Sequence, residues 1–141
     1  ELNNYYLSND KTLLDKKLIY NHLSKNCYWA LGRSETKVLK SLETSLCFGV
    51  YTKSHQQVGF ARVVTDECIF AWIHDVFILP EYQGLGLSKK LIADIKAHPS
   101  LQNLQRWGLS TKDAHGLYEK FGFSRLVPTE QGIMEIVDKP S

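Results

Sequence analysis

The spacing of hydrophobic residues changes along the chain and separates helical from extended segments. Near the start, apolar residues repeat at helical spacing over 13–23, just after turn and cap residues. A second helix is expected over 35–43, because Ser34 can accept hydrogen bonds from its first turn. The pattern therefore predicts two consecutive helices, with a short strand at 4–7 ahead of them.

Three β-rich runs follow, and the polar turn between the first two predicts an antiparallel meander. A glycine-containing turn, a helix, a short strand, a short helix and one or two final strands come next. The expected ranges are 46–52, 58–65 and 70–79 for the meander, 83–88 for the turn, 106–110, 114–121 and 124–137, with a helix from Leu87 that His98-Pro99 stops. This order predicts one α+β domain over 1–141, with a mixed, mostly antiparallel sheet.

The composition is that of an ordinary globular domain. The chain has 141 residues, of which 43% are hydrophobic and 23% charged, enough to bury one core without disulfides or metals. Its net charge of +2 is scattered along the chain, so no nucleic-acid partner is expected. No apolar stretch approaches a membrane span and the start lacks signal-peptide features, so we expect no membrane partner and a cytoplasmic location.

The three cysteines, Cys27, Cys47 and Cys68, are an odd number and lie far apart in apolar surroundings. They have no CxxC pair and no histidine at metal-ligand spacing. We therefore expect reduced, buried thiols and no metal site.

The turn over 83–88 carries candidate cofactor chemistry. Gly84 and Gly86 let the backbone adopt positive φ and approach a ligand closely, and a helix N-terminus follows them. Lys89 and Lys90 add positive charge beside the same point. Such a turn can hold a pyrophosphate, but the third glycine of a dinucleotide fingerprint and the Lys-Ser/Thr of a Walker loop are missing.

Two segments resemble motifs of the GCN5-related N-acetyltransferase family. In 76–89 a strand ends near Pro80, and Gln83, Gly86 and Ser88 take the marked positions of Q/R-x-x-G-x-G/A, with Ser replacing the last small residue. Residues 111–123 match N-x-x-A-x-x-L-Y-x-x-x-G-F, with Thr111 in place of Asn. Together the motifs cover about a third of the chain, and the expected element order agrees with the family over nearly all of it.

The resemblance implies a fold in which about four helices flank a sheet with two splayed parallel strands, here 70–79 and 106–110. Acetyl-coenzyme A would lie in the opening as the cosubstrate, held largely by backbone groups. The residues that the resemblance assigns to it are Val76, Phe77, Ile78, Gln83, Gly84, Leu85, Gly86, Leu87, Ser88, Lys89 and Thr111.

The resemblance further implies an acetyltransferase in which a primary amine attacks the thioester directly. Tyr118 matches the family tyrosine that donates a proton to the coenzyme sulfur, and a backbone N–H near Ile78 would stabilise the oxyanion. Asp75 and His74 are the candidate bases, with Asp75 ranked first; strand alternation places them on opposite faces of the sheet, so only one is expected to reach the cleft. Alternatively, Asp75 orders Arg62, and His74 is a strand histidine with satisfied hydrogen bonds.

The two early helices and their connection are expected to form the acceptor pocket. Trp29 could line it and Arg33 could bind a carboxylate, unless Trp29 belongs to the core and Arg33 pairs with Glu35 or caps a helix. Three further aromatic residues are expected in the core: Tyr28, Phe48 and Trp72.

We therefore expect a small-molecule or peptide amine as the acceptor, and Arg33 favours an acidic or carboxylate-bearing one. Two alternatives stay open: a non-catalytic coenzyme A sensor, and acylation of a protein lysine or a hydroxyl group. The C-terminal strand offers an edge through which two subunits could pair as a homodimer.

Overall fold

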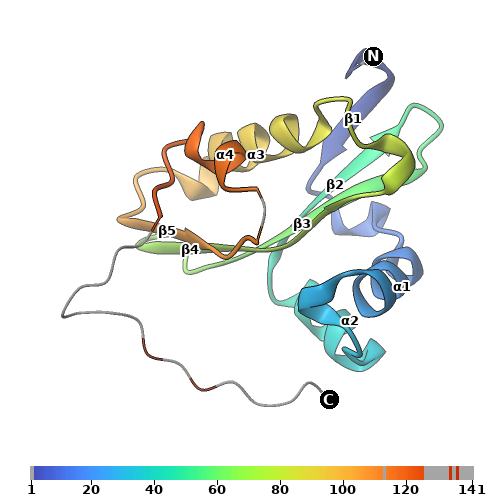
Figure 1. The fold of residues 1–141 in the computed structure, drawn as a ribbon, viewed down its shortest axis with the longest axis horizontal. Coiled ribbons are helices and arrows are strands. Elements are labelled where there is room, and N and C mark those ends of the chain that lie inside the picture. Colours follow the sequence, from blue (N-terminus) through green and yellow to red (C-terminus); the bar gives the residue numbers. More distant parts are fainter. Residues whose placement is uncertain (1, 113, 126–133, 135, 137–141) are drawn as a thin grey trace.

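A five-stranded sheet forms the centre of the computed structural model, which describes residues 2–112, 114–125, 134 and 136. The strands lie in chain order, β1 to β5; the first four are antiparallel, and β4 and β5 run parallel (Figure 1). Their bounds are β1 Tyr5–Ser8, β2 Leu46–Thr52, β3 Gln57–Thr65, β4 Phe70–Ile78 and β5 Arg106–Leu109. The predicted meander and mixed sheet are confirmed.

The helices cover both faces of this sheet. In Figure 1, α3 and α4 lie on one face and α1 and α2 on the other. The helices are α1 Lys16–Asn26, α2 Glu35–Glu43, α3 Leu87–Ala97 and α4 His115–Glu119, and the 3-10 turns are η1 Leu2–Asn4, η2 Lys11–Leu13, η3 Tyr28–Ala30, η4 Pro80–Tyr82 and η5 Pro99–Leu101. None of the helices in the described ranges is long and apolar enough to cross a membrane.

The caps set where the first two helices begin. The Ser34 side chain accepts the N–H of Lys37, so α2 starts as predicted. Asp10 caps only the short η2 turn, whereas Asp15 accepts the N–H of Leu18 and starts α1 at residue 16. The expected start at residue 13 was therefore too early. The predicted strand over 124–137 lies mainly outside the described residues.

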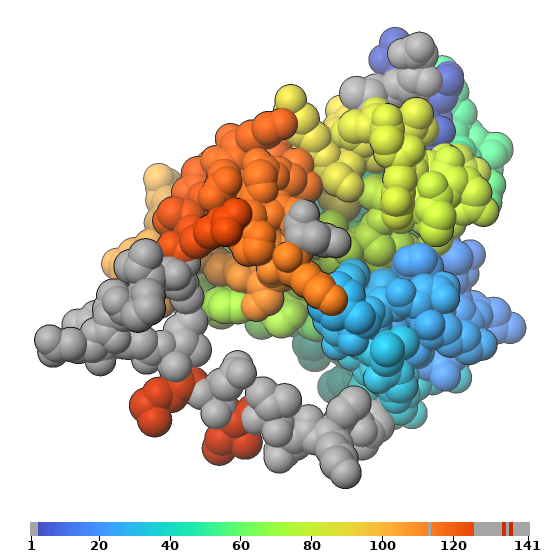
Figure 2. Space-filling model, in the orientation of Figure 1, coloured from blue at the N-terminus to red at the C-terminus, as the bar shows by residue number. Residues whose placement is uncertain are grey.

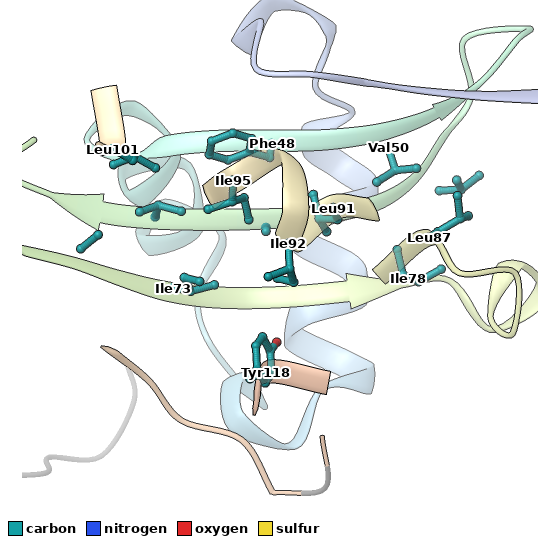
Figure 3. Packing of buried hydrophobic residues seen from close by; sticks show 14 residues of the cluster. Phe48, Val50, Ile73, Ile78, Leu87, Leu91, Ile92, Ile95, Leu101 and Tyr118 are labelled. Atoms are coloured by element: carbon teal, nitrogen blue, oxygen red, sulfur yellow. The ribbon is translucent and has the colours of Figure 1, made fainter. Parts of the chain in front are cut away.

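Hydrophobic side chains form one cluster on each face of the sheet. Between the sheet and α3, the helix contributes four fully buried residues, which Figure 3 shows beside Phe48 and Val50 of β2 and Ile73 and Ile78 of β4. The second cluster joins α1 and α2 to the opposite face through Phe60 and Phe77. Each buried side chain of this size contributes about 1.5–3 kcal/mol, so both helix layers are held by packing.

Two predicted core residues lie at the surface instead. Cys27, Cys47 and Phe48 are buried as expected, but Cys68 is exposed. The Asp66 carboxylate accepts three consecutive backbone N–H groups there and folds residues 66–70 into a tight turn, which carries Cys68 outward. Tyr28 is 55% exposed because η3 lies at the rim of the fold.

A β-bulge interrupts β4. Phe60 pairs with Phe77 and Arg62 with His74, so both Asp75 and Val76 lie opposite the single residue Ala61. Asp75 has φ of 56°, a left-handed conformation that is rare within a strand. The extra residue shifts the alternation of side chains between the two faces of the sheet by one position.

The bulge places His74 and Asp75 on the same face. Ile73 and Val76 belong to the α3 cluster, whereas Asp75 bonds to side chains on the α1 and α2 side, and His74 lines a cavity with them. The expectation that these two residues face opposite sides was wrong, because it assumed a regular strand.

Candidate active site

A cavity of about 850 Å³ opens where β4 and β5 separate. Their parallel pairing ends at Ile73 and Leu109, while β4 continues to Ile78. The walls come from α1, η3, β4, α4 and the start of α3, so the cavity passes between the two helix layers. Its volume is within the range of ligand sites, and it brings together part of each motif: Val76, Ile78 and Ser88 from the first and Thr111 and Tyr118 from the second.

The β5–α4 connection and η3 meet at the rim of this cavity. In Figure 2 the orange surface near residue 110 lies against the blue surface of the α1–η3 region. The Lys112 Nζ lies 5.2 Å from the centre of the Tyr28 ring, a cation–π distance. This contact connects the two walls on the face shown.

The glycine turn has the conformation that an anion cradle requires. Gly84 and Gly86 have φ of 80° and 82°, and no side chain caps α3. A Cβ added at either glycine would meet nothing within 4 Å, and a hollow of about 260 Å³ lies over the turn beside Ser88. The first residues of α3 therefore line this hollow, and the free N–H groups of a helix start there fit the pyrophosphate of acetyl-coenzyme A.

Other residues near the turn have structural contacts of their own. The Gln83 amide donates to the Ile78 carbonyl at 2.9 Å and ties the turn to the end of β4. Leu87 is buried in the core, so only its backbone is available to a ligand, whereas Leu85 and Lys89 are exposed. The turn therefore offers backbone groups together with the exposed side chain of Lys89.

Beyond the bulge, every second residue of β4 directs its backbone N–H toward the space where β4 and β5 separate. The Leu79 N–H donates to Val58 on β3 at 2.8 Å. Successive N–H groups of a strand point to opposite edges, so those of Ile78 and Val76 point away from β3, toward the cavity. Phe77 faces β3 and packs its ring in the core.

Tyr118 lies on α4 with the residues of the α3 cluster (Figure 3), and it also lines the cavity. It is 7% exposed, and its hydroxyl makes no hydrogen bond to any residue in the described ranges. Burial raises the pKa of the phenol, so it stays protonated at neutral pH. The Thr111 hydroxyl accepts the N–H of Ala114 at 3.1 Å and fixes the start of this short helix.

Asp75 is held by three donors. Its Oδ1 accepts the Trp29 Nε1–H at 3.0 Å, and its Oδ2 accepts Arg33 Nη1 at 2.9 Å and Arg62 Nε at 3.0 Å. Burial alone raises the pKa of this carboxyl, but the charges and hydrogen bonds of Arg62 and Arg33 outweigh burial and lower it. The carboxylate, with its side chain 1% exposed, anchors both predicted acceptor residues to the sheet.

Two histidines line the same part of the cavity. Burial lowers the pKa of His74, and the nearby charge of Arg62 lowers it further. Burial also lowers the pKa of His22, which packs against Phe77 with ring centres 4.3 Å apart. Both rings are therefore neutral near pH 7 and able to accept a proton.

His22 and Asn26 were not among the predicted site residues. They lie four residues apart on α1 and so share one side of it, next to the buried Leu23. A polar pair beside an apolar stripe marks the edge of a packed face, but the sequence did not reveal that this edge borders a cavity.

Cys27 also lines the cavity but is poorly suited as a nucleophile. Burial, with the charge of Asp75, raises the pKa of this thiol to about 11. It is therefore protonated at neutral pH. In the described part of the chain, no group of three or more His, Cys, Asp or Glu side chains could hold a metal ion.

Comparisons with known proteins agree with this architecture. The family model described as "Acetyltransferase (GNAT) domain" matches residues 43–125. A Gibberella zeae protein named "Putative acetyltransferase FG08082" is 31% identical over 135 residues, covering 82% of this chain and 76% of that protein. The "Uncharacterized N-acetyltransferase ycf52" of Porphyra purpurea is 33% identical over 133 residues, covering 87% and 72%.

A solved structure extends the match to nearly the whole fold. The protein, from Xanthomonas campestris pv. campestris, is described as "a putative acetyltransferase belonging to the gnat family". It superposes with a TM-score of 0.89 at 41% identity, covering 94% of this chain and 93% of that one. The chain therefore belongs to the GCN5-related N-acetyltransferase (GNAT) family of acetyltransferases.

Proposed function

We propose that this protein is an N-acetyltransferase that moves an acetyl group from acetyl-coenzyme A to a primary amine by direct attack on the thioester. One observation carries the proposal: Ser88, beside the glycine turn, Tyr118 and His74 all line a single cavity. The part of this cavity lined by Trp29, Arg33 and His74 is called the chamber. Acetyl-coenzyme A, when bound, supplies an activated acetyl group and a thiolate leaving group.

His74 is the proposed general base. Its ring lines the cavity and its lowered pKa keeps it neutral, so it can take a proton from the attacking amine. Asp75 is less suited to this role, because three donors already occupy its oxygens and lower its pKa. We assign Asp75 instead to positioning Trp29 and Arg33.

Two further groups would stabilise charge as the thioester reacts. The Ile78 N–H, directed away from β3, is the proposed donor to the developing oxyanion. Tyr118 keeps its proton and has no hydrogen-bond partner among the described residues, so its hydroxyl is available to protonate the departing sulfur.

Replacing Tyr118 with Phe tests the proposal. The variant should lower kcat about 10²-fold, measured as release of free thiol over a panel of amines, while the Kd for acetyl-coenzyme A stays within about twofold. Tyr20→Phe is the matched control, because Tyr20 lies on α1 outside the cavity. Unchanged turnover would remove Tyr118 from the mechanism.

The wild-type protein separates the alternatives in the same assay. Tight binding of acetyl-coenzyme A without thiol release over the whole panel would indicate a sensor, and release with hydroxyl compounds alone would indicate O-acylation.

A further inference from the structure

The charges around Asp75 do not balance. One buried carboxylate faces two guanidinium groups, those of Arg33 and Arg62, which leaves a surplus of one positive charge. In the described ranges, Asp75 is the only acidic residue that lines the cavity. A partly buried surplus charge costs free energy unless an anion approaches it.

Of the two arginines, Arg33 is the one that an anion in the cavity can reach. It lines the cavity with 23% of its side chain exposed, and Nη1 makes its one hydrogen bond to a described residue. A guanidinium has five N–H donors, so the others remain available. Arg62, in contrast, lies outside the cavity lining and also donates to Ser45.

The position of Arg33 is fixed before any ligand binds. Its carbonyl accepts the Ser24 hydroxyl of α1, and its N–H donates to Ala30 at 3.0 Å. Asp75 holds the guanidinium from the other side. A side chain held at both ends loses little rotamer entropy on binding, which favours a planar anion such as a carboxylate.

The rest of the chamber presents flat aromatic rings beside a further cation, Lys112. Trp29 is 42% exposed, and its Nε1–H bond to Asp75 fixes the orientation of the ring. Tyr28 is more exposed still, and the neutral rings of His22 and His74 add no charge. A polycationic amine would meet the surplus positive charge with no described carboxylate free to bind it.

We propose that the acceptor is an anionic amine: its primary amine is accompanied by a carboxylate or phosphate group, which the free donors of Arg33 bind while Trp29 packs against the body of the molecule. This inference rests on the proposed N-acetyltransferase function for the identity of the reacting group. The chemistry that it adds is the anion.

Matched acceptors that differ only in the anion provide the test. Phenylalanine is compared with phenylalaninamide, and glucosamine 6-phosphate with glucosamine; the two pairs distinguish a carboxylate from a phosphate source. In at least one pair, the anionic member should have a kcat/KM about 10- to 100-fold higher, the range of a hydrogen-bonded charge pair. Spermidine should be a poor substrate. Equal or better use of the neutral or cationic amines would overturn the inference.

Arg33 variants show whether this residue carries the preference. Arg33→Gln should bring the two members of the preferred pair to within about twofold by lowering only the anionic one, and Arg33→Lys should retain part of the preference. Loss of Arg33 leaves Asp75 paired with Arg62, so the fold should persist. Lys16→Gln removes a charge at the far end of α1 and should change neither member. An equal loss for both members would assign Arg33 a structural role only.

Calorimetry with the same pairs, in the presence of coenzyme A, separates this inference from the proposed function. Preferential binding of an anionic member that Arg33→Gln abolishes, without thiol release from any amine, would support the inference and refute the enzyme. Acetylation of neutral or cationic amines alone would support the proposed enzyme and refute the inference. If neither anionic member binds more tightly than its partner, the inference is refuted whatever the turnover.

Discussion

Asp75→Asn probes the hydrogen bonds that join Trp29 and Arg33, the two residues proposed to bind the acceptor amine, to the sheet. Asn keeps the shape of the side chain and tolerates the left-handed backbone at φ of 56° about as well as Asp, so little new strain is introduced. The substitution removes the negative charge between Arg33 and Arg62 and replaces one acceptor oxygen with an N–H donor. It therefore isolates the electrostatic part of the contact.

The expected loss of stability follows from the burial of the pair. Removing one partner of a buried ion pair costs about 3–5 kcal/mol. The Arg33 and Arg62 side chains keep 23% and 12% of their exposure, so water can compensate in part. We expect about 3 kcal/mol, a large share of the roughly 5–15 kcal/mol that stabilises a domain.

Urea denaturation measures this loss. With a slope of roughly 2 kcal/mol per M, the midpoint should fall by about 1.5 M. Asp94→Asn is the control: Asp94 is exposed on α3, so its midpoint should stay within about 0.3 M. A shift for Asp75→Asn as small as that of the control would refute the anchoring role.

The pH dependence gives a second readout of the same contact. Because the pKa of Asp75 is lowered in the folded state, its contribution is present above the ordinary value of 3.8 and is lost as pH falls through the lowered pKa. The difference in stability between wild type and Asp75→Asn should be constant near neutral pH and shrink below 3.8. A difference that grows on acidification would contradict the assignment.

Two further variants test the base and the close approach of β4 and β5. With both substrates saturating, wild-type kcat should fall as the pH drops through the lowered pKa of His74, below 6.5. In His74→Gln, kcat should be about 10²-fold lower and should no longer fall over this pH range. A variant with the same dependence of kcat on pH as the wild type would exclude His74 as the base. Gly108→Ala should lower the free energy of unfolding, measured by urea denaturation, by about 1–3 kcal/mol, because a Cβ there overlaps the Trp72 ring. Gly116→Ala is the control, because the space around Gly116 is open. Equal stability of the two variants would contradict this prediction.

Local signals allowed much of the fold to be predicted. Ser34 caps α2 and a nearly continuous apolar run defines β2, and both elements have the predicted bounds. The glycine turn was also accessible, because its conformation depends on Gly84 and Gly86 themselves. Each of these features is set by residues close together in the chain.

The acceptor end could not be predicted in the same way. The ion pair between Arg33 and Asp75 spans 42 residues, and no local pattern identifies the partner. The bulge at Asp75 depends on the register between β3 and β4, so alternation along β4 alone gave the wrong face for one of two neighbouring residues. Tyr28 has an apolar sequence context, yet its exposure depends on where η3 meets the cavity rim.

The most direct test of the central claim is calorimetric titration of the protein with acetyl-coenzyme A. The wild type should bind one equivalent saturably, and Gly86→Asp should weaken binding at least about 100-fold, since its carboxylate would enter the open space over the turn and repel the pyrophosphate. Gly122→Asp adds the same charge at another left-handed glycine, outside the cavity lining, and should bind normally. Absence of binding by the wild type, or equal binding by Gly86→Asp, would contradict the account.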